Sequence, residues 1–182
     1  HLGFPSKGAE NFAINLDKAK KLPSFKLGIN IGINSGTSDA TGDIDFCLKR
    51  LARYASYIAI NVSCPNTPGL SAWQVGDKLS EMVEKAILTL SRPSNKKSPP
   101  LLVKIGQELD DKELAGIAKV ALNTGIDGLV ACNTTGQRPA VLRSSYANEV
   151  GGLSGSPIRK KANQTLSKLY KMTNGKVVLI GC

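Results

Sequence analysis

A regular alternation of short apolar runs with amphipathic helical patterns constrains the fold of this chain more than any other feature. Five runs are apolar along nearly their whole length instead of at every second position: residues 27–33, 57–62, 101–105, 128–132 and 177–180. Runs of this kind are typical of strands in a parallel sheet that helices cover. We therefore predict that the five runs form one parallel sheet.

Four segments between the runs carry apolar residues three and four positions apart, which places these residues on one face of a helix. They are Ile44, Cys47, Leu48, Leu51, Tyr54 and Ala55; Leu79, Met82, Val83, Ala86, Ile87 and Leu90; Leu114, Ile117, Ala118, Ala121 and Leu122; and Ala162, Leu166, Leu169 and Tyr170. Asp110 or Asp111 can cap the third helix, and Gly125 can end it. Ser156 is expected to cap the fourth helix with its hydroxyl, with Pro157 at the first helical position. The order β-α-β-α-β-α-β-loop-α-β is typical of parallel α/β sheets.

Polar side chains gather near the ends of four consecutive predicted strands. These residues are Asn30, Asn61, Lys104 and Asn133. An open doubly wound sheet concentrates its binding residues at one switch point, whereas an α/β barrel collects them around one mouth. The sequence also lacks a dinucleotide-binding glycine fingerprint and a P-loop. We therefore predict an α/β fold in which residues 1–182 form one domain, the central portion (about five of eight βα units) of a TIM-type (β/α)₈ barrel.

The composition narrows the class of partners. The chain carries 24 Lys and Arg against 14 Asp and Glu, a formal net charge of +10. The basic residues are scattered and almost no aromatic residues lie among them, so we expect no nucleic-acid partner. The four cysteines show no CxxC spacing, which favours a reducing compartment and leads us to expect no metal site. No apolar stretch approaches the roughly 20 residues that span a bilayer.

The segment that follows the second predicted strand holds the strongest functional signal. Residues 61–70 read Asn-Val-Ser-Cys-Pro-Asn-Thr-Pro-Gly-Leu. The Cys64 thiol, with an ordinary pKa of about 8.5, can serve as a base near neutral pH with modest help. Asn61 and Asn66 flank it with amides that can hold a planar polar ligand. Lys104 adds a cation suited to a phosphate or a flavin edge. This set predicts proton removal next to a carbonyl.

This segment resembles the catalytic segment of the dihydroorotate dehydrogenases. Further motifs occur in the order found in that family: residues 27–32 (LGINIG), 103–105 (VKI), 125–129 (GIDGL), 133–135 (NTT) and 151–155 (GGLSG). The ending TPGL at residues 67–70 and the GGLSG motif are similar to those of the membrane-associated, quinone-dependent class 2 enzymes.

The resemblance implies an FMN-containing (β/α)₈ barrel that oxidises dihydroorotate to orotate in pyrimidine biosynthesis, with a quinone as final electron acceptor. Cys64 stands at the position of the catalytic base. The substrate-binding positions are Asn61, Asn66, Asn133 and Thr134. The flavin-binding positions are Asn30, Asn61, Lys104 and Gly155. Such an enzyme lies at the mitochondrial inner membrane in eukaryotes, or on the cytoplasmic face of the inner membrane in bacteria.

Three departures from the family pattern bear on function. Cys64 stands where class 2 enzymes have Ser and soluble class 1 enzymes have Cys. A class 1-like dihydroorotate dehydrogenase, or another FMN enzyme acting on a pyrimidine ring, is therefore an alternative. Pro5 replaces an Asn that contacts substrate, which would remove one hydrogen bond. Residues 105–109 (IGQEL) replace the usual IAPDL, and we expect a looser loop after Lys104.

The resemblance covers only part of such a barrel. The five predicted strands align with the third to the seventh strand of the family. The first two strands, the eighth strand and the N-terminal helical domain that meets quinone and membrane have no counterpart in residues 1–182. We therefore expect a truncated domain whose membrane association depends on that missing segment. Whether it catalyses alone is open, and a non-catalytic basic binding remnant is a second alternative.

Overall fold

Parallel strands form the centre of the structure, a computed structural model that describes residues 5–19, 25–63, 69–91, 97–140 and 142–182. The strands are β1 (Gly28–Gly32), β2 (Tyr57–Asn61), β3 (Leu101–Ile105), β4 (Gly128–Ala131) and β5 (Val178–Gly181). They lie side by side in the order β1-β2-β3-β4-β5, and every neighbouring pair is parallel. The predicted parallel sheet is confirmed, with each strand end within one residue of its expected place.

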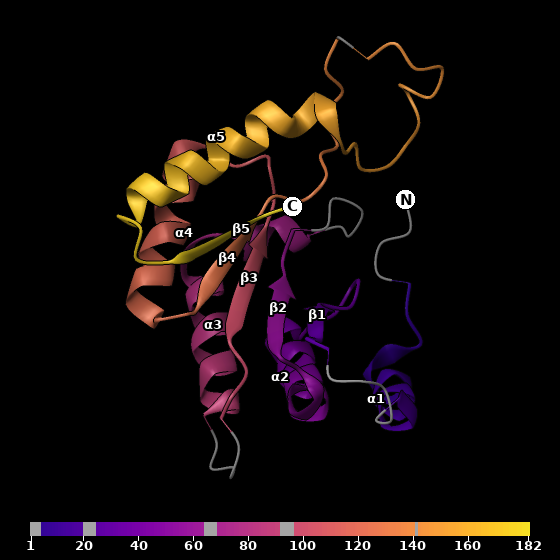
Figure 1. Cartoon of the computed structure of the whole chain (residues 1–182), viewed down its shortest axis with the longest axis vertical. Helices are drawn as coiled ribbons and strands as arrows, with labels where there is room; N and C mark the ends of the chain where they lie inside the picture. The colour runs from indigo at the N-terminus through magenta and orange to yellow at the C-terminus, as the bar shows by residue number, and fades with distance from the viewer. Residues whose placement is uncertain (1–4, 20–24, 64–68, 92–96, 141) are drawn as a thin grey trace.

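Helices connect these strands in sequence order. They are α2 (Ala40–Leu51), α3 (Gly76–Leu90), α4 (Asp111–Thr124) and α5 (Ser156–Met172), with two short 3₁₀ turns, η2 (Ala52–Tyr54) and η3 (Leu70–Trp73). Each of these α-helices contacts the next, and Figure 1 shows them following one another around the curved sheet. A doubly wound sheet would reverse its strand order at a switch point. The described strands show no such reversal, so their arrangement is that of a partial barrel.

The ends of α4 follow the rules that predicted them. The Asp110 side chain accepts a hydrogen bond from the Glu113 backbone N–H at 2.8 Å, and the Glu113 carboxylate accepts one from the Asp110 N–H at 2.8 Å. This capping box satisfies two of the N–H groups that a helix start leaves unpaired. Gly125 ends the helix in the left-handed region, with φ 72°. Asp110, not Asp111, is therefore the cap.

The start of α5 differs from its prediction. Gly155 is the N-cap residue, with φ 84°, and no side chain caps the helix. Ser156 is instead the first helical residue, so the expected hydroxyl cap is wrong. The positive φ of Gly155, which glycine adopts at low cost, turns the chain into the helix one residue earlier. The backbone N–H groups of the first turn consequently donate no hydrogen bond to a capping side chain.

The core lies between the sheet and the helices. The largest fully buried side chains come from both layers: Ile29, Ile44, Leu48, Ile58, Ile60, Leu79, Met82, Ile105, Leu114, Ile117, Leu129 and Leu169. Burying one such side chain contributes about 1.5–3 kcal/mol. On the strand face turned away from the helices, Asn30, Val178 and Ile180 are exposed. A ligand therefore has access to the sheet on that second face.

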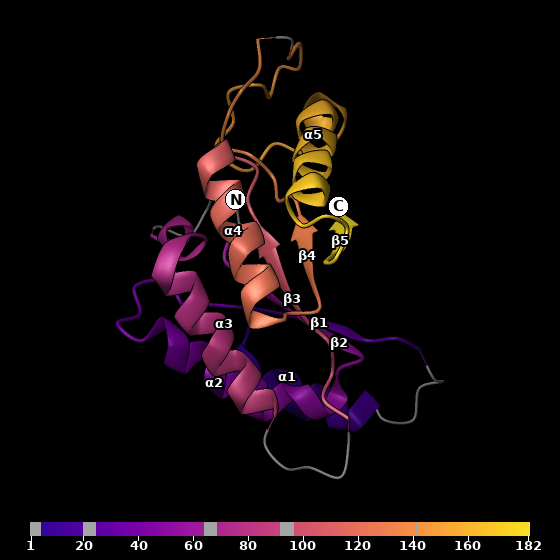
Figure 2. The same cartoon turned by 90° about the vertical axis from the view of Figure 1, so that its left-hand side faces the viewer.

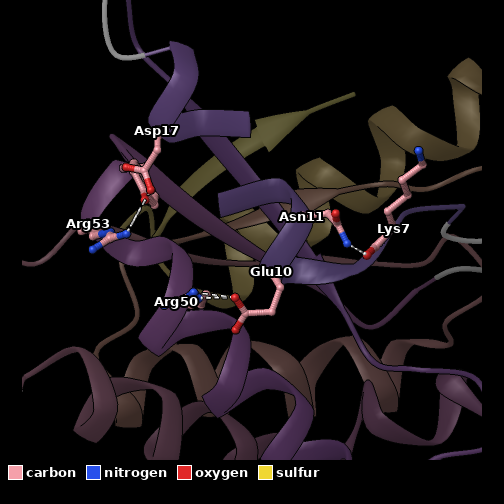
Figure 3. Close-up of polar contacts among 7 residues, drawn as sticks. Lys7, Glu10, Asn11, Asp17, Arg50 and Arg53 are labelled. Atoms are coloured by element: carbon pink, nitrogen blue, oxygen red, sulfur yellow. Dashed lines mark hydrogen bonds and ion pairs between the residues drawn. The ribbon is translucent and has the colours of Figure 1, made fainter. Parts of the chain in front are cut away.

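One helix was not predicted. Helix α1 (Gly8–Lys18) buries Ala13 and packs Ala9 and Leu16 against the core. Figure 3 shows α1 beside α2 and η2: Arg50 of α2 donates to the Glu10 carboxylate at 2.8 Å, and Arg53 of η2 lies 3.5 Å from Asp17. Its apolar residues Ala9, Phe12, Ala13 and Leu16 recur three and four positions apart, so the periodic signal of a helix was present in the sequence.

The longest connection of the described chain lies between β4 and α5. Figures 1 and 2 show it projecting beyond the end of the sheet at which β3 and β4 finish. Because parallel strands all finish at that end, the loops that follow them meet there.

Among the described residues, no helix combines the length and apolar character needed to cross a bilayer.

Candidate active site

Strand register places three of the predicted site residues on one face of the sheet. Asn61 pairs with Gly32 on one side and with Lys104 on the other, and Lys104 pairs with Val130. Residues opposite each other in a parallel pair point to the same side, as do residues two positions apart in one strand. Asn30 therefore shares this face with Asn61 and Lys104.

A cavity of about 530 Å³ lies at the carboxyl ends of β3, β4 and β5, beside the start of α5. Four predicted site residues line it: Lys104, Asn133, Thr134 and Gly155. Lys104 comes from β3, Asn133 and Thr134 follow β4, and Gly155 caps α5. Its volume falls in the range of small-molecule and cofactor sites. Residues from three separate segments of the chain thus meet around one space, as the barrel prediction required.

The remaining predicted residues lie in different places. Asn61 is buried, with 5% of its surface exposed, and Ser63 connects it to Asn133. Asn30 is exposed and is not among the residues that line the cavity. Cys64 and Asn66 lie outside the described residues, so the assignments of base and substrate amide at these positions stay predictions.

Among the other residues that line the cavity, two carry groups whose place there the sequence did not predict. Arg159 brings a guanidinium from the first turn of α5. A basic residue directly after a glycine-rich turn and a helix start was the available signal, since anions bind at such positions. Cys132, expected in the core, is buried and also borders the cavity. Burial raises the pKa of its thiol, which favours the neutral form.

Hydrogen bonds to Glu108 tie the loop after β3 to the loop after β4. The Glu108 carboxylate accepts from the Thr135 hydroxyl and from the Gly136 backbone N–H, the latter at 2.8 Å. These bonds, the Thr135 hydroxyl first, hold the pKa of Glu108 below its usual value. Thr135 also forms a two-bond antiparallel bridge with Leu153, which precedes α5. The two segments that supply Thr134 and Gly155 are therefore fastened to each other.

Gln107 corrects the expectation of a looser loop after Lys104. Its side chain is 2% exposed, and its Nε2 donates to the Ile158 carbonyl of α5 at 3.2 Å. The preceding Gly106 N–H donates to the buried Gln74 side chain. Polar side chains buried in this way anchor the backbone to which they bond. The segment after β3 is thus fixed to α5 and not loosened.

Arg138 holds the start and the end of the long connection together. Its Nη2 donates to the carbonyls of Glu149 and Gly151, both at 2.7 Å. Its Nη1 donates to the carbonyls of Thr135, Gly136 and Gln137 at 3.1–3.3 Å. The planar guanidinium, with donors in a fixed fork, can serve several carbonyls at once.

Within the described residues, no group of three or more His, Cys, Asp or Glu side chains could hold a metal ion.

A family model described as dihydroorotate dehydrogenase matches residues 1–182, the whole chain. The chain belongs to the dihydroorotate dehydrogenase family. Its relatives in this family include the dihydroorotate dehydrogenase (quinone) of Rhodospirillum rubrum, 44% identical over 180 residues, which cover 99% of this chain and 48% of that protein. The protein of the same name from Pseudoalteromonas translucida is 40% identical over 185 residues, which cover 99% of this chain and 54% of that protein.

Solved structures agree with this family membership. The crystal structure of the dihydroorotate dehydrogenase of Eimeria tenella in complex with ferulenol matches with a TM-score of 0.93 and 39% identity, covering 98% of this chain and 54% of that one. The ligand-free structure from the same organism also gives a TM-score of 0.93, with 39% identity, and covers 98% of this chain and 56% of that one. The predicted TIM-type fold is confirmed. The chain spans about half the length of the curated relatives it matches.

Proposed function

We propose that this chain forms the central part of the catalytic barrel of a quinone-dependent dihydroorotate dehydrogenase, which oxidises dihydroorotate to orotate in pyrimidine biosynthesis. Membership of the family and the names of its relatives support this proposal. The observation that carries it is the meeting of Lys104, Asn133, Thr134 and Gly155 around one cavity. The family motifs assign these four residues to the flavin and the substrate, which must lie against each other.

We assign FMN to this cavity and to the adjoining face of the sheet: Lys104 and Gly155 line the cavity, and Asn30 and Asn61 lie on the sheet face that Lys104 shares. The first turn of α5 has no side-chain cap, so its backbone N–H groups can receive a phosphate. Arg159 and Lys104 add two cations to the same cavity. Gly155 has no side chain that would fill this space. Bound FMN would supply the hydride acceptor and pass the electrons to a quinone.

We assign the substrate to Asn61, Asn66, Asn133 and Thr134, and the removal of its C5 proton to Cys64. Carboxamides and a hydroxyl suit a planar ring that carries both carbonyl and N–H groups. A thiol whose ordinary pKa is about 8.5 can take such a proton near neutral pH. The described part of this set, Asn61, Asn133 and Thr134, lies at the ends of two strands on the mouth of the sheet.

The test is to purify the protein with FMN and assay dihydroorotate oxidation with different electron acceptors. We expect flavin absorbance, reduction of the flavin by dihydroorotate, and turnover with a soluble ubiquinone analogue. Preference for fumarate or NAD over the quinone would instead assign the class 1-like alternative that Cys64 favours. Protein that takes up no flavin, but is retained on nucleic acid in a steeply salt-dependent way, would support a basic binding remnant.

We further propose that the protein works at a membrane, at the mitochondrial inner membrane or on the cytoplasmic face of the bacterial inner membrane. The quinone in the names of its relatives supports this location, because quinones of respiratory chains dissolve in the lipid phase. Fractionation of cells that express the protein tests it. Recovery of the activity with the membranes is expected, and recovery only in the high-speed supernatant would contradict it.

A further inference from the structure

Ser63 lies between two of the carboxamides assigned to the substrate. It follows β2 by two residues and is 5% exposed. Its hydroxyl hydrogen-bonds Asn61 on its own strand and Asn133 beyond β4, 70 residues further along the chain. Nothing in the family motifs assigned Ser63 a role of its own. The inference below rests on the proposed function, because it concerns what these two amides offer a ligand.

Hydrogen bonds from Ser63 occupy the oxygen of Asn61. Asn61 Oδ1 accepts from the Ser63 backbone N–H at 3.1 Å and from the Ser63 hydroxyl at 2.9 Å. The assignment of oxygen and nitrogen is fixed, because a flipped amide would place its NH₂ against a backbone N–H. The part of Asn61 that stays available to a ligand is therefore its Nδ2, a hydrogen-bond donor.

Asn133 is held in the opposite sense. Its Nδ2 donates to the Ser63 carbonyl at 3.1 Å and to the Ser63 hydroxyl at 3.0 Å. Its Oδ1 accepts from the Thr134 backbone N–H at 2.8 Å. Both N–H bonds of the amide have partners, whereas the carbonyl oxygen has two lone pairs and uses only one. Asn133 therefore offers a ligand an acceptor.

We propose that Ser63 is a positioning residue that fixes the polarity of both amides, so that Asn61 presents a donor and Asn133 an acceptor. A hydroxyl is suited to this task because it accepts from one amide while it donates to the other. The matching ligand edge carries a carbonyl oxygen for Asn61 and an N–H for Asn133, as a ring amide or ureide does. A ligand without that N–H leaves the part-buried Asn133 oxygen with one lone pair unpaired, and sites built to hydrogen-bond an N–H discriminate against ligands that lack it.

The test compares orotate with orotate methylated on its ring nitrogens, by equilibrium binding to the FMN-loaded protein. We expect the unsubstituted protein to prefer orotate by about tenfold or more. Ser63→Ala should weaken orotate binding by about tenfold and leave the methylated ligand almost unaffected, so that the preference falls toward one. A preference unchanged in Ser63→Ala would overturn the proposal.

Ser56→Ala is the matched control. Ser56 lies at the opposite end of β2, where its hydroxyl accepts from the Leu27 backbone N–H at 3.1 Å. The Ser56→Ala variant loses a hydroxyl oxygen, as Ser63→Ala does, but from a part-buried position far from the site. It therefore reports the general effect of removing a serine hydroxyl. We expect its ligand preference to equal that of the unsubstituted protein. An equal fall in both variants would also overturn the proposal.

A second measurement uses the unsubstituted protein without ligand, so it depends neither on the folding of a variant nor on ligand binding. The side-chain amide protons of Asn133 should exchange slowly with solvent in NMR spectra of the unsubstituted protein, because both have partners. Exchange as fast as that of an exposed Asn would overturn the proposal. If the unsubstituted protein binds no orotate, the proposed function fails, whereas slow exchange at Asn133 would still support the role of Ser63 in fixing the amide.

Discussion

At the scale of single residues, the contact between Gly152 and Thr134 limits the shape of the site most closely. A Cβ atom at position 152 would lie 2.0 Å from Thr134 Oγ1 and 2.6 Å from Thr134 Cβ. Neither distance is tolerable, and movement of the hydroxyl alone would not relieve the second one. Any side chain at position 152 must therefore displace the Thr134 backbone or its own.

We predict that Gly152→Ala weakens orotate binding by about tenfold or more, since Thr134 would leave its place beside Asn133. Isothermal titration of the FMN-loaded protein with orotate measures this loss. Gly116→Ala is the control, because a Cβ atom at that position in α4 meets nothing within 4 Å. It should bind orotate normally and gain up to about 1 kcal/mol in stability. Normal orotate binding by Gly152→Ala would show that Thr134 does not position the ligand.

The identity of the base gives a second residue-scale prediction. Cys64→Ala should abolish turnover and leave FMN bound, because it removes the proton acceptor and no assigned flavin contact. Cys64→Ser should keep some turnover, with its optimum moved to higher pH, since a hydroxyl is a far weaker acid than a thiol. Steady-state rates across the pH range measure both effects. Near-normal rates in Cys64→Ala would exclude Cys64 as the base.

At the scale of elements, one carboxylate fastens the loop after β3 to the loop after β4. Glu108 has a lowered pKa because it accepts hydrogen bonds, first from Thr135 and then from the backbone at Gly136. A group whose pKa is lower in the folded state stabilises that state above its unfolded pKa, near 4.5. This contribution is lost as the pH falls through the folded pKa.

Glu108→Gln should therefore lower the free energy of unfolding by about 1 kcal/mol or less at pH 7, since Glu108 is largely exposed and solvent screens it. The difference from the unsubstituted protein should shrink as the pH drops below about 4.5. Urea unfolding at a series of pH values measures it. A difference that stays constant from pH 7 to pH 3 would mean that the charge of Glu108 contributes nothing.

Arg138 allows a test of the long connection before α5. Arg138→Lys keeps the charge but cannot donate to five carbonyls from one planar group. We predict faster proteolytic cleavage between residues 136 and 155, with an unchanged unfolding transition for the rest of the protein. Arg143→Lys, at an exposed position of the same connection, is the control. Equal cleavage rates in both variants would contradict the role given to Arg138.

At the scale of the whole molecule, local sequence patterns predicted the sheet well and the loops poorly. The strands are continuous apolar runs and the helices α2 to α5 carry apolar residues three and four positions apart, and both patterns depend only on near neighbours in the sequence. Glu108 and Thr135 are 27 residues apart, and Ser63 and Asn133 are 70 apart. No local pattern encodes such pairs, so the resemblance to a family predicted four of the residues that line the cavity but not the hydrogen bonds that hold them there.

The cavity joins three strands and one helix, so a ligand bound in it should stabilise the fold as a unit. FMN that binds only the folded protein adds about 2.7 kcal/mol at a concentration one hundred times its Kd. We predict that the Tm rises with FMN concentration. Arg159→Ala removes a cation from the cavity, so it should weaken FMN binding by about tenfold. The stabilisation by FMN should then be about 1.4 kcal/mol smaller. The neighbouring exposed Lys160, which does not line the cavity, gives the control Lys160→Ala. Calorimetric scans over a range of FMN concentrations decide the matter: if Arg159→Ala and Lys160→Ala respond alike, the phosphate does not lie at the start of α5.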